Sequence, residues 1–285
     1  MERAVAVLAS QVRLEERLLL AALDRRGAAY EQVDPRRLRA VLGARATQGW
    51  GTVLNREISH TRAVYAARTL EAMGCVVVNS AAATDVCGDK WRTSLALHAA
   101  GVPTPRTALA LTPDAALTAV EDMGYPAVIK PLVGSWGRLV TLVPDRHTAE
   151  TVLEYVAALP SPQSHVVYVQ ECVPGLDRDL RVIVIGGEVV GATYRRASGW
   201  RANVARGARS EPCPVTPDLA GLALAAAAAA GADIAGVDLV EGRDGGLQVL
   251  EVNHRVEFGG FQAAHGGRVD VAGRVADHLL SRVAA

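Results

Sequence analysis

Two carboxylates and an amide late in the chain are spaced to share one patch of a strand pair. If Asp244-Gly245 is a two-residue turn between the two apolar runs that flank it, Glu251 lies directly opposite Asp238. Asn253 lies two residues further and projects from the same face. Buried carboxylates repel each other and lose hydration, so they need a cation, and this donor set suits Mg²⁺. The alternative is an amphipathic hairpin whose acids face solvent.

A lysine and a short glycine-rich loop further upstream could hold phosphates. Lys130 ends an apolar run, and the sequence Gly-Ser-Trp-Gly-Arg follows at 134–138. The two glycines let the backbone approach a ligand, its N–H groups can cradle phosphate oxygens, and lysine adds a compact charge. The loop is not a Walker A motif, because no Gly-Lys-Ser/Thr follows. Alternatively, Lys130 reaches past apolar neighbours to solvent, and the loop is a surface hairpin.

Three further features are weaker signals. Lys90 stands at a helix start, where the helix dipole disfavours a cation, so it faces either an anion or solvent. The segment Gln170–Val173 leaves a strand, and its backbone could pair with a purine edge. Four arginines and an amide suit phosphate or carboxylate recognition, or form a solvated loop: Arg195, Arg196, Arg201, Asn203 and Arg206.

Composition limits the functional classes. The chain has 285 residues, half of them hydrophobic, and 30 basic residues balance 30 acidic ones, which disfavours nucleic-acid binding. The longest uncharged apolar run, Leu219–Ala232, is too short to span a bilayer. No export signal is visible, and Cys75, Cys87, Cys172 and Cys213 lack metal-type spacing, so we expect a cytoplasmic protein with reduced thiols.

Strand and helix patterns alternate up to about residue 80, which predicts a small parallel α/β lobe. A helix is expected over Arg13–Arg26, with Leu14, Leu18 and Ala22 on its inner face. Thr-Pro-Asp sequences at 112–114 and 216–218 predict two helix starts.

Taken in order, these pieces resemble the ATP-grasp superfamily: a lysine before the central lobe, a lysine on a central strand, a glycine-rich lid, a Gln-Glu-x-Val hinge and Asp…Glu-x-Asn. Within it the chain is similar to the RimK/LysX branch, and to the LysX subgroup in particular. The similar stretches are CGDKW (87–91), KPLVGSWGR (130–138), DLRVIVIG (179–186), YRR (194–196) and EVNH (251–254).

The resemblance implies an α/β fold with α+β lobes: a Rossmann-like pre-ATP-grasp lobe (1–88), a central lid lobe (89–168) and a C-terminal antiparallel lobe (169–285) with the Mg²⁺ site. It implies an ADP-forming ligase that joins an amino acid such as 2-aminoadipate, through an acyl phosphate, to the C-terminal glutamate of a small acidic carrier protein. ATP and two Mg²⁺ ions (or Mn²⁺) would be required, in a homodimer or tetramer. A RimK-type glutamate ligase, a ligase of two free small molecules and a nucleotide-binding regulator are the alternatives.

The resemblance also implies residue roles. ATP would contact Lys90, Lys130, Ser135, Trp136, Gly137, Glu171, Cys172, Val173, Asp179 and Arg201. The acyl-transfer groups would be Arg195, Asn203 and Arg206, and the metal ligands Asp238, Glu251 and Asn253. The chain departs from the subgroup at 204 and 208 and within 259–267, so we expect substrate specificity in 195–208 and 257–267. His254 is expected to point away from the metal ligands and to be structural.

Overall fold

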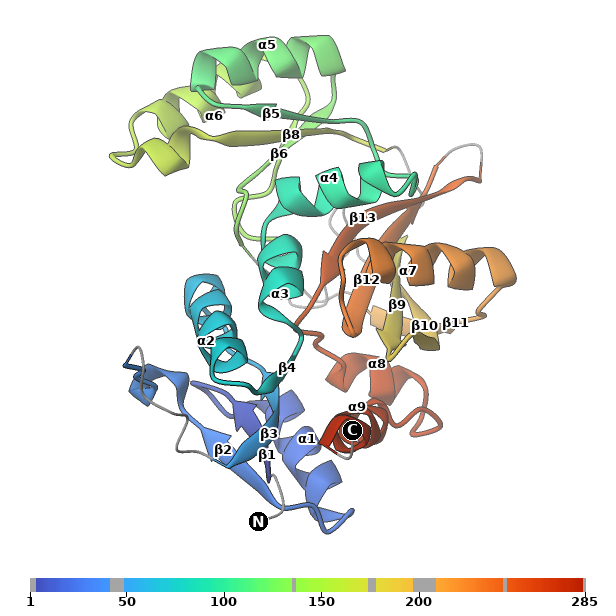
Figure 1. Cartoon of the computed structure of the whole chain (residues 1–285). Coiled ribbons are helices and arrows are strands. Elements are labelled where there is room, and N and C mark those ends of the chain that lie inside the picture. The colour runs from blue at the N-terminus through green and yellow to red at the C-terminus, as the bar shows by residue number, and fades with distance from the viewer. Residues whose placement is uncertain are drawn as a thin grey trace.

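The computed structural model describes residues 4–41, 49–134, 137–173, 178–196, 209–242 and 245–283 (Figure 1). Its first lobe is a four-stranded parallel sheet in the order β2-β1-β3-β4, which confirms the predicted small parallel α/β lobe. The elements of this lobe are β1 (Ala4–Leu8), α1 (Leu14–Asp24), β2 (Tyr30–Val33), η1 (Pro35–Arg37), β3 (Trp50–Asn55), α2 (His60–Ala72) and β4 (Val76–Val78).

Strand β1 is apolar throughout because both faces of this sheet are covered. Val5 and Val7 pack into one buried cluster together with α1 and the C-terminal helix. Ala6 and Leu8 alternate to the other face and pack against α2. Alternate side chains of the strand therefore pack into two separate hydrophobic cores.

The inner face of α1 differs from the prediction. Leu14 is 48% exposed, whereas Leu19, Ala22 and Leu23 are buried. Glu16 is also buried, because the guanidinium of Arg56 pairs with its carboxylate at 2.9 Å. Acidic side chains are rarely buried unless they are paired, and the contacts of Glu16 with Arg56 and Arg13 provide that pairing.

The central lobe carries an antiparallel sheet in the order β5-β8-β6-β7, covered on one face by α5 and α6 (Figure 1). Thr112 caps α5 by accepting a hydrogen bond from the Ala115 N–H, which confirms the predicted start. The elements from 81 to 171 are α3 (Ala81–Gly88), α4 (Lys90–Ala99), β5 (Thr107–Ala110), α5 (Pro113–Met123), β6 (Ala127–Lys130), β7 (Thr141–Val143), α6 (Arg146–Ala157), η2 (Pro162–His165) and β8 (Val167–Glu171).

The C-terminal lobe is a five-stranded antiparallel sheet in the order β11-β10-β9-β12-β13. Its elements are β9 (Arg178–Ile185), β10 (Glu188–Arg196), β11 (Arg209–Cys213), α7 (Pro217–Ala229), β12 (Ile234–Glu241), β13 (Leu247–Asn253), α8 (Gly259–Ala264) and α9 (Val271–Val283). Helix α7 packs on this sheet, and its start at Thr216 is confirmed. Helix α9 lies against α1, so the first and last lobes share one core (Figure 1).

The β12–β13 pairing confirms that Glu251 lies opposite Asp238, although the turn that was used to predict it is different. Asp238 does pair with Glu251, but Leu239 pairs with Val249 and Glu241 with Leu247. The Gly242 N–H donates to the Gly246 carbonyl, so Gly246 pairs with Gly242 and not with Arg243, as a two-residue turn would require. A bulge between Asp238 and Leu239 compensates for this shift and brings the two acids opposite each other.

None of the helices in the described ranges has the length and apolar character that crossing a lipid bilayer requires.

Candidate active site

The three predicted metal-binding side chains lie together on β12 and β13. The Asn253 Nδ2 atom is 3.2 Å from Glu251 Oε1 and 3.3 Å from Asp238 Oδ2. Which end of an amide carries the oxygen is set by its surroundings, so a cation between the carboxylates would turn the Asn253 oxygen toward itself. The predicted shared face is therefore present.

Arginines neutralise the deeper of the two acids. Arg181 makes a bidentate pair with Asp238, and Arg195 Nη2 lies 3.1 Å from Asp238 Oδ1. Burial raises the pKa of Asp238, but these two cations outweigh it and lower the pKa to about 2. Asp238 is 3% exposed and stays ionised beneath the site, whereas Glu251 and Asn253 line a pocket.

Arg181 was missed from the sequence, and Asp179 and Arg195 were assigned separate roles. They are cross-strand neighbours: Asp179 pairs with Arg195 across β9–β10, and Arg181 with Asp238 across β9–β12. Arg195 donates to both oxygens of Asp179 at 2.6 and 2.7 Å. Two acids and two arginines thus form a buried, nearly neutral cluster under the pocket floor.

Two lysines flank the acids. Lys130 Nζ donates to Gln170 Oε1 at 2.5 Å and lies 5.8 Å from the centre of the Tyr168 ring. Burial lowers the pKa of Lys130 to about 8, although the charge of Glu251 opposes this shift. Lys90 Nζ donates to the Gly134 carbonyl at 3.1 Å, which ties the start of α4 to the glycine-rich loop. Lys90 therefore faces this loop rather than open solvent.

The hinge residues lie where the central lobe meets the C-terminal lobe. Glu171 accepts a hydrogen bond from the Arg106 N–H at 2.9 Å. Cys172 and Val173 are half-buried, and burial raises the pKa of the Cys172 thiol. Gly137 is described, with φ at 61°. The remaining predicted residues lie outside the described residues: Ser135, Trp136, Arg201, Asn203 and Arg206.

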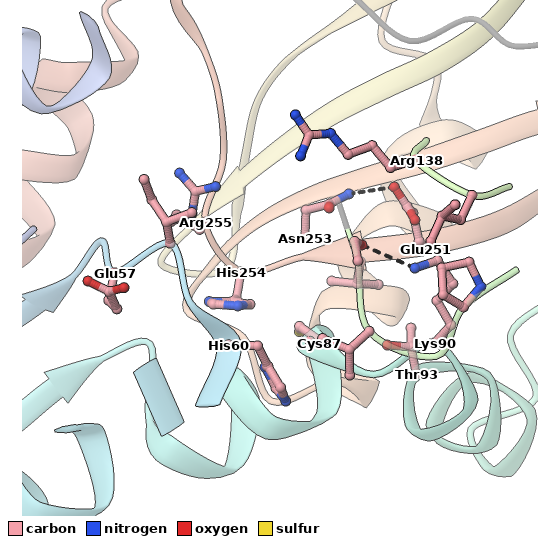
Figure 2. Close-up of a pocket in the computed structure, with 17 residues that line it drawn as sticks. Glu57, His60, Cys87, Lys90, Thr93, Arg138, Glu251, Asn253, His254 and Arg255 are labelled. Atoms are coloured by element: carbon pink, nitrogen blue, oxygen red, sulfur yellow. Dashed lines mark hydrogen bonds between the residues drawn. The ribbon is translucent and has the colours of Figure 1, made fainter. Parts of the chain in front are cut away.

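A pocket of about 370 Å³ lies where the three lobes meet, and it has two ends (Figure 2). The lid end is formed by Lys90, Gly134, Arg138, Glu251 and Asn253. The N-lobe end is formed by Glu57, His60, His254 and Arg255.

Sequence reasoning missed the N-lobe end, except that it treated His254 as structural. His254 lines the pocket, and its pKa is lowered to about 3 by burial and then by the charge of Arg255; its structural role stays a prediction. Gly88 is needed nearby, since a Cβ atom there would lie 2.0 Å from His60 Nδ1. No sequence pattern links residues 57–60 with 254–255; only the packing of the first lobe on the last joins them.

The comparisons with known proteins place this geometry in a family. The profile of the RimK-like ATP-grasp domain matches residues 87–279. The profile of the LysX pre-ATP-grasp domain matches residues 5–86. The chain is therefore an ATP-dependent ligase of the ATP-grasp class. Within that class it belongs to the RimK-like family and carries a LysX-type first domain, which confirms the resemblance seen in the sequence.

Two groups of curated relatives and two solved structures support this. The glutamate–LysW ligase ArgX of Sulfolobus acidocaldarius is 33% identical over 96% of this chain and 97% of its own. The alpha-aminoadipate–LysW ligase LysX of Saccharolobus solfataricus is 34% identical over 72% of this chain and 75% of its own. A RimK domain ATP-grasp protein from Sphaerobacter thermophilus superimposes with a TM-score of 0.81 at 29% identity, covering 97% of this chain and 99% of its own. The ATP-grasp ligase PsnB shares the fold, with a TM-score of 0.76 at 22% identity over 99% of this chain and 100% of its own.

Proposed function

We propose that this enzyme joins the amino group of an acidic amino acid to the C-terminal carboxylate of a small LysW-type carrier protein. The relatives that align over 96% of the chain are glutamate–LysW ligases, and alpha-aminoadipate–LysW ligases align over 72% of it. The observation that carries the proposal is the pocket, which brings Lys90 from one lobe beside Glu251 and Asn253 of another. ATP, a carboxylate and an amine can meet there.

Magnesium fits the donor set at the lid end. Glu251 and Asn253 offer oxygens at the pocket wall, and Asp238 lies beneath them with its charge held ionised by Arg181 and Arg195. We assign Glu251 and Asn253 as direct ligands, with Asp238 able to join them by leaving Arg181. Bound Mg²⁺ would neutralise phosphate charge during transfer.

The protein's own groups account for positioning. Lys90 and Lys130 supply fixed positive charge for the ATP phosphates, and Glu171–Val173 provide the hinge for adenine. Asp179 is held by Arg195, so we propose that it orients this arginine toward the transferred phosphate. The roles of Ser135 and Trp136 in a lid, and of Arg201, Asn203 and Arg206 near the acyl group, stay predictions.

The proposed chemistry has two steps. The carrier carboxylate attacks the γ-phosphorus of ATP, and ADP leaves with the electrons of the broken P–O bond. The amine nitrogen then attacks the acyl carbon, loses a proton, and inorganic phosphate leaves as the amide forms. The acyl phosphate would hydrolyse in water, so the glycine-rich loop is proposed to close over it.

Finer properties complete the proposal. Two Mg²⁺ ions, replaceable by Mn²⁺, would serve the reaction. Among the described residues no disulfide links the cysteines, which suits the reducing cytoplasm. A homodimer or tetramer is proposed from the family resemblance.

The test is a reconstitution with ATP, Mg²⁺, a LysW-type carrier and glutamate or 2-aminoadipate. We expect ADP release that requires the carrier, and a mass gain on the carrier equal to the amino acid minus one water. ADP release that is independent of the carrier, with no mass gain on it, would refute the proposal.

A further inference from the structure

Four buried polar atoms at the N-lobe end of the pocket lack hydrogen-bond partners among the described residues. They belong to side chains that all line the pocket, and Figure 2 shows these side chains on the side away from Lys90 and Glu251. The atoms are Glu57 Oε2, His60 Nδ1, His254 Nδ1 and Arg255 Nη1. Buried polar groups are rarely left unpaired, so this concentration in one wall calls for a ligand.

Among these four side chains, Arg255 has the greatest need for a negatively charged partner. Its side chain is 9% exposed, and the nearest acid the structure gives it, Glu257, lies 4.0 Å away, beyond hydrogen-bonding distance. Glu257 is bound by Arg13 at 3.0 Å, so its charge is shared. Glu16, the next acid acting on Arg255, is held by Arg56 at 2.9 Å.

The neighbours of Arg255 add to this imbalance. Arg56 and Arg13 both repel its charge, and burial followed by these two cations lowers the pKa of Arg255 to about 10. A buried guanidinium without its own acid is costly, and a planar fork with free N–H groups matches a carboxylate. The chemistry of this wall therefore selects an anion with carboxylate geometry.

The other three atoms favour a small molecule with further polar groups. Glu57 uses Oε1 for the Ser59 N–H and for Arg62, which leaves Oε2 to accept a hydrogen bond from a ligand. The two imidazoles can each donate or accept. An amino acid offers both a carboxylate and N–H donors.

The position of Arg255 fits the amine partner rather than the carrier tail. It follows the metal-binding Asn253 by two residues, a separation of at most about 7 Å along the backbone. A molecule bound by its distal carboxylate at Arg255 can thus extend its amine toward the lid end, where the carrier carboxylate must meet the phosphates.

We infer that the N-lobe end is the subsite for the amino acid substrate: Arg255 binds a carboxylate of that substrate, and Glu57, His60 and His254 hydrogen-bond its other polar groups. This inference rests on the proposed ligase function. It places substrate specificity in a pocket wall outside 195–208 and 257–267, the segments in which the sequence predicted it.

The test compares Arg255→Met with the wild type and with a matched control, Arg274→Met. Arg274 is exposed and pairs with Glu188 on the surface. In Arg255→Met we expect the KM for the amino acid to rise about 10- to 100-fold, the range for losing one charged hydrogen-bond partner. The KM values for ATP and carrier should stay within about twofold, and the control should match the wild type.

Hydroxylamine separates the subsite from the phosphate chemistry. It is a small amine without a carboxylate and traps an acyl phosphate as a hydroxamate on the carrier. Arg255→Met should form this hydroxamate at the wild-type rate. Loss of that reaction, an unchanged KM for the amino acid, or a raised KM for the carrier instead would overturn the inference.

Stability gives a second, independent readout. Removing a charge that Arg13 and Arg56 repel should leave the melting temperature unchanged or higher. A melting temperature lowered by several degrees would identify Arg255 as structural and overturn the assignment. If the wild type itself gives no carrier-dependent ADP release or hydroxamate, the proposed function fails, which is distinct from failure of the variant alone.

Discussion

The two ends of the pocket differ in how their charges are compensated. At the lid end the polar groups satisfy one another: Lys90 is bound to the Gly134 carbonyl, Asn253 to Glu251, and Asp238 to Arg181. At the N-lobe end Arg255 and Glu57 each retain a buried atom that hydrogen-bonds to no described group. The polar groups of the lid end would exchange their internal partners for a cation and phosphates. The unbonded groups of the N-lobe end would gain their partners from a ligand.

The largest expected effect comes from the cluster beneath the lid end. Asp238→Ala would leave Arg181 and Arg195 buried with one acid fewer, and breaking a buried pair in this way costs about 3–5 kcal/mol of unfolding free energy. Urea unfolding followed by circular dichroism measures this loss. Glu241→Ala, which removes the half-buried partner of Arg178, is the control and should cost about 1 kcal/mol or less. A loss below about 1 kcal/mol for Asp238→Ala would show that Arg181 and Arg195 do not depend on this acid. It would contradict the internal charge compensation described for the lid end.

Glu251→Gln tests the wall of the lid end while both arginines and both acids of that cluster are kept. The substitution keeps the shape of the side chain but removes the charge proposed to hold Mg²⁺, so carrier-dependent ADP release should fall about 10²- to 10³-fold. The melting temperature should stay near that of the wild type, because Glu251 lines the pocket and the amide of glutamine can still accept the hydrogen bond from Asn253. Glu188→Gln, on the exposed hairpin, is the matched control. Near-wild-type turnover in Glu251→Gln would remove this residue from the metal site.

The smallest expected effect concerns Lys130. Burial lowers the pKa of Lys130 to about 8, so in the free protein its charge is complete below that value and is lost as the pH rises through it. Phosphates bind the charged form, and nucleotide affinity should therefore fall about tenfold between pH 7 and pH 9. Calorimetric titration with ADP and Mg²⁺ at several pH values measures the decline, and Lys130→Met should bind more weakly with a flatter profile. Equal affinity across this range in the wild type would exclude Lys130 as a phosphate contact.

Much of the lid end could be predicted from the sequence, because its signals are local. Asp238, Glu251 and Asn253 belong to one hairpin, and a period of two along each strand is enough to place them on one face. Even so, the turn differed from the predicted two-residue turn, and the bulge after Asp238 restored the pairing. The sequence could not reveal a bulge, since no Gly or Pro marks it.

The N-lobe end could not be predicted, because its members come from opposite ends of the chain. Glu57 and His60 follow a strand of the first lobe, and His254 and Arg255 follow a strand of the last. The inner face predicted for α1 was wrong at Leu14 for a related reason, since the buried neighbours of this helix include Arg56, which pairs with Glu16 from another segment. The N-lobe end and the buried face of α1 both depend on contacts between segments that share no sequence pattern.

The sequence by itself determined the parallel α/β first lobe, the helix starts at Thr112 and Thr216, and the strand pair that carries Asp238, Glu251 and Asn253, because hydrogen bonding and side-chain periodicity act within a few residues. Only the tertiary structure decided which arginines neutralise Asp238 and which side chains wall the second end of the pocket. The reason is physical: Arg255 is buried among Arg13, Glu16 and Arg56 of the first lobe, and contacts between segments so far apart in the chain follow no sequence pattern.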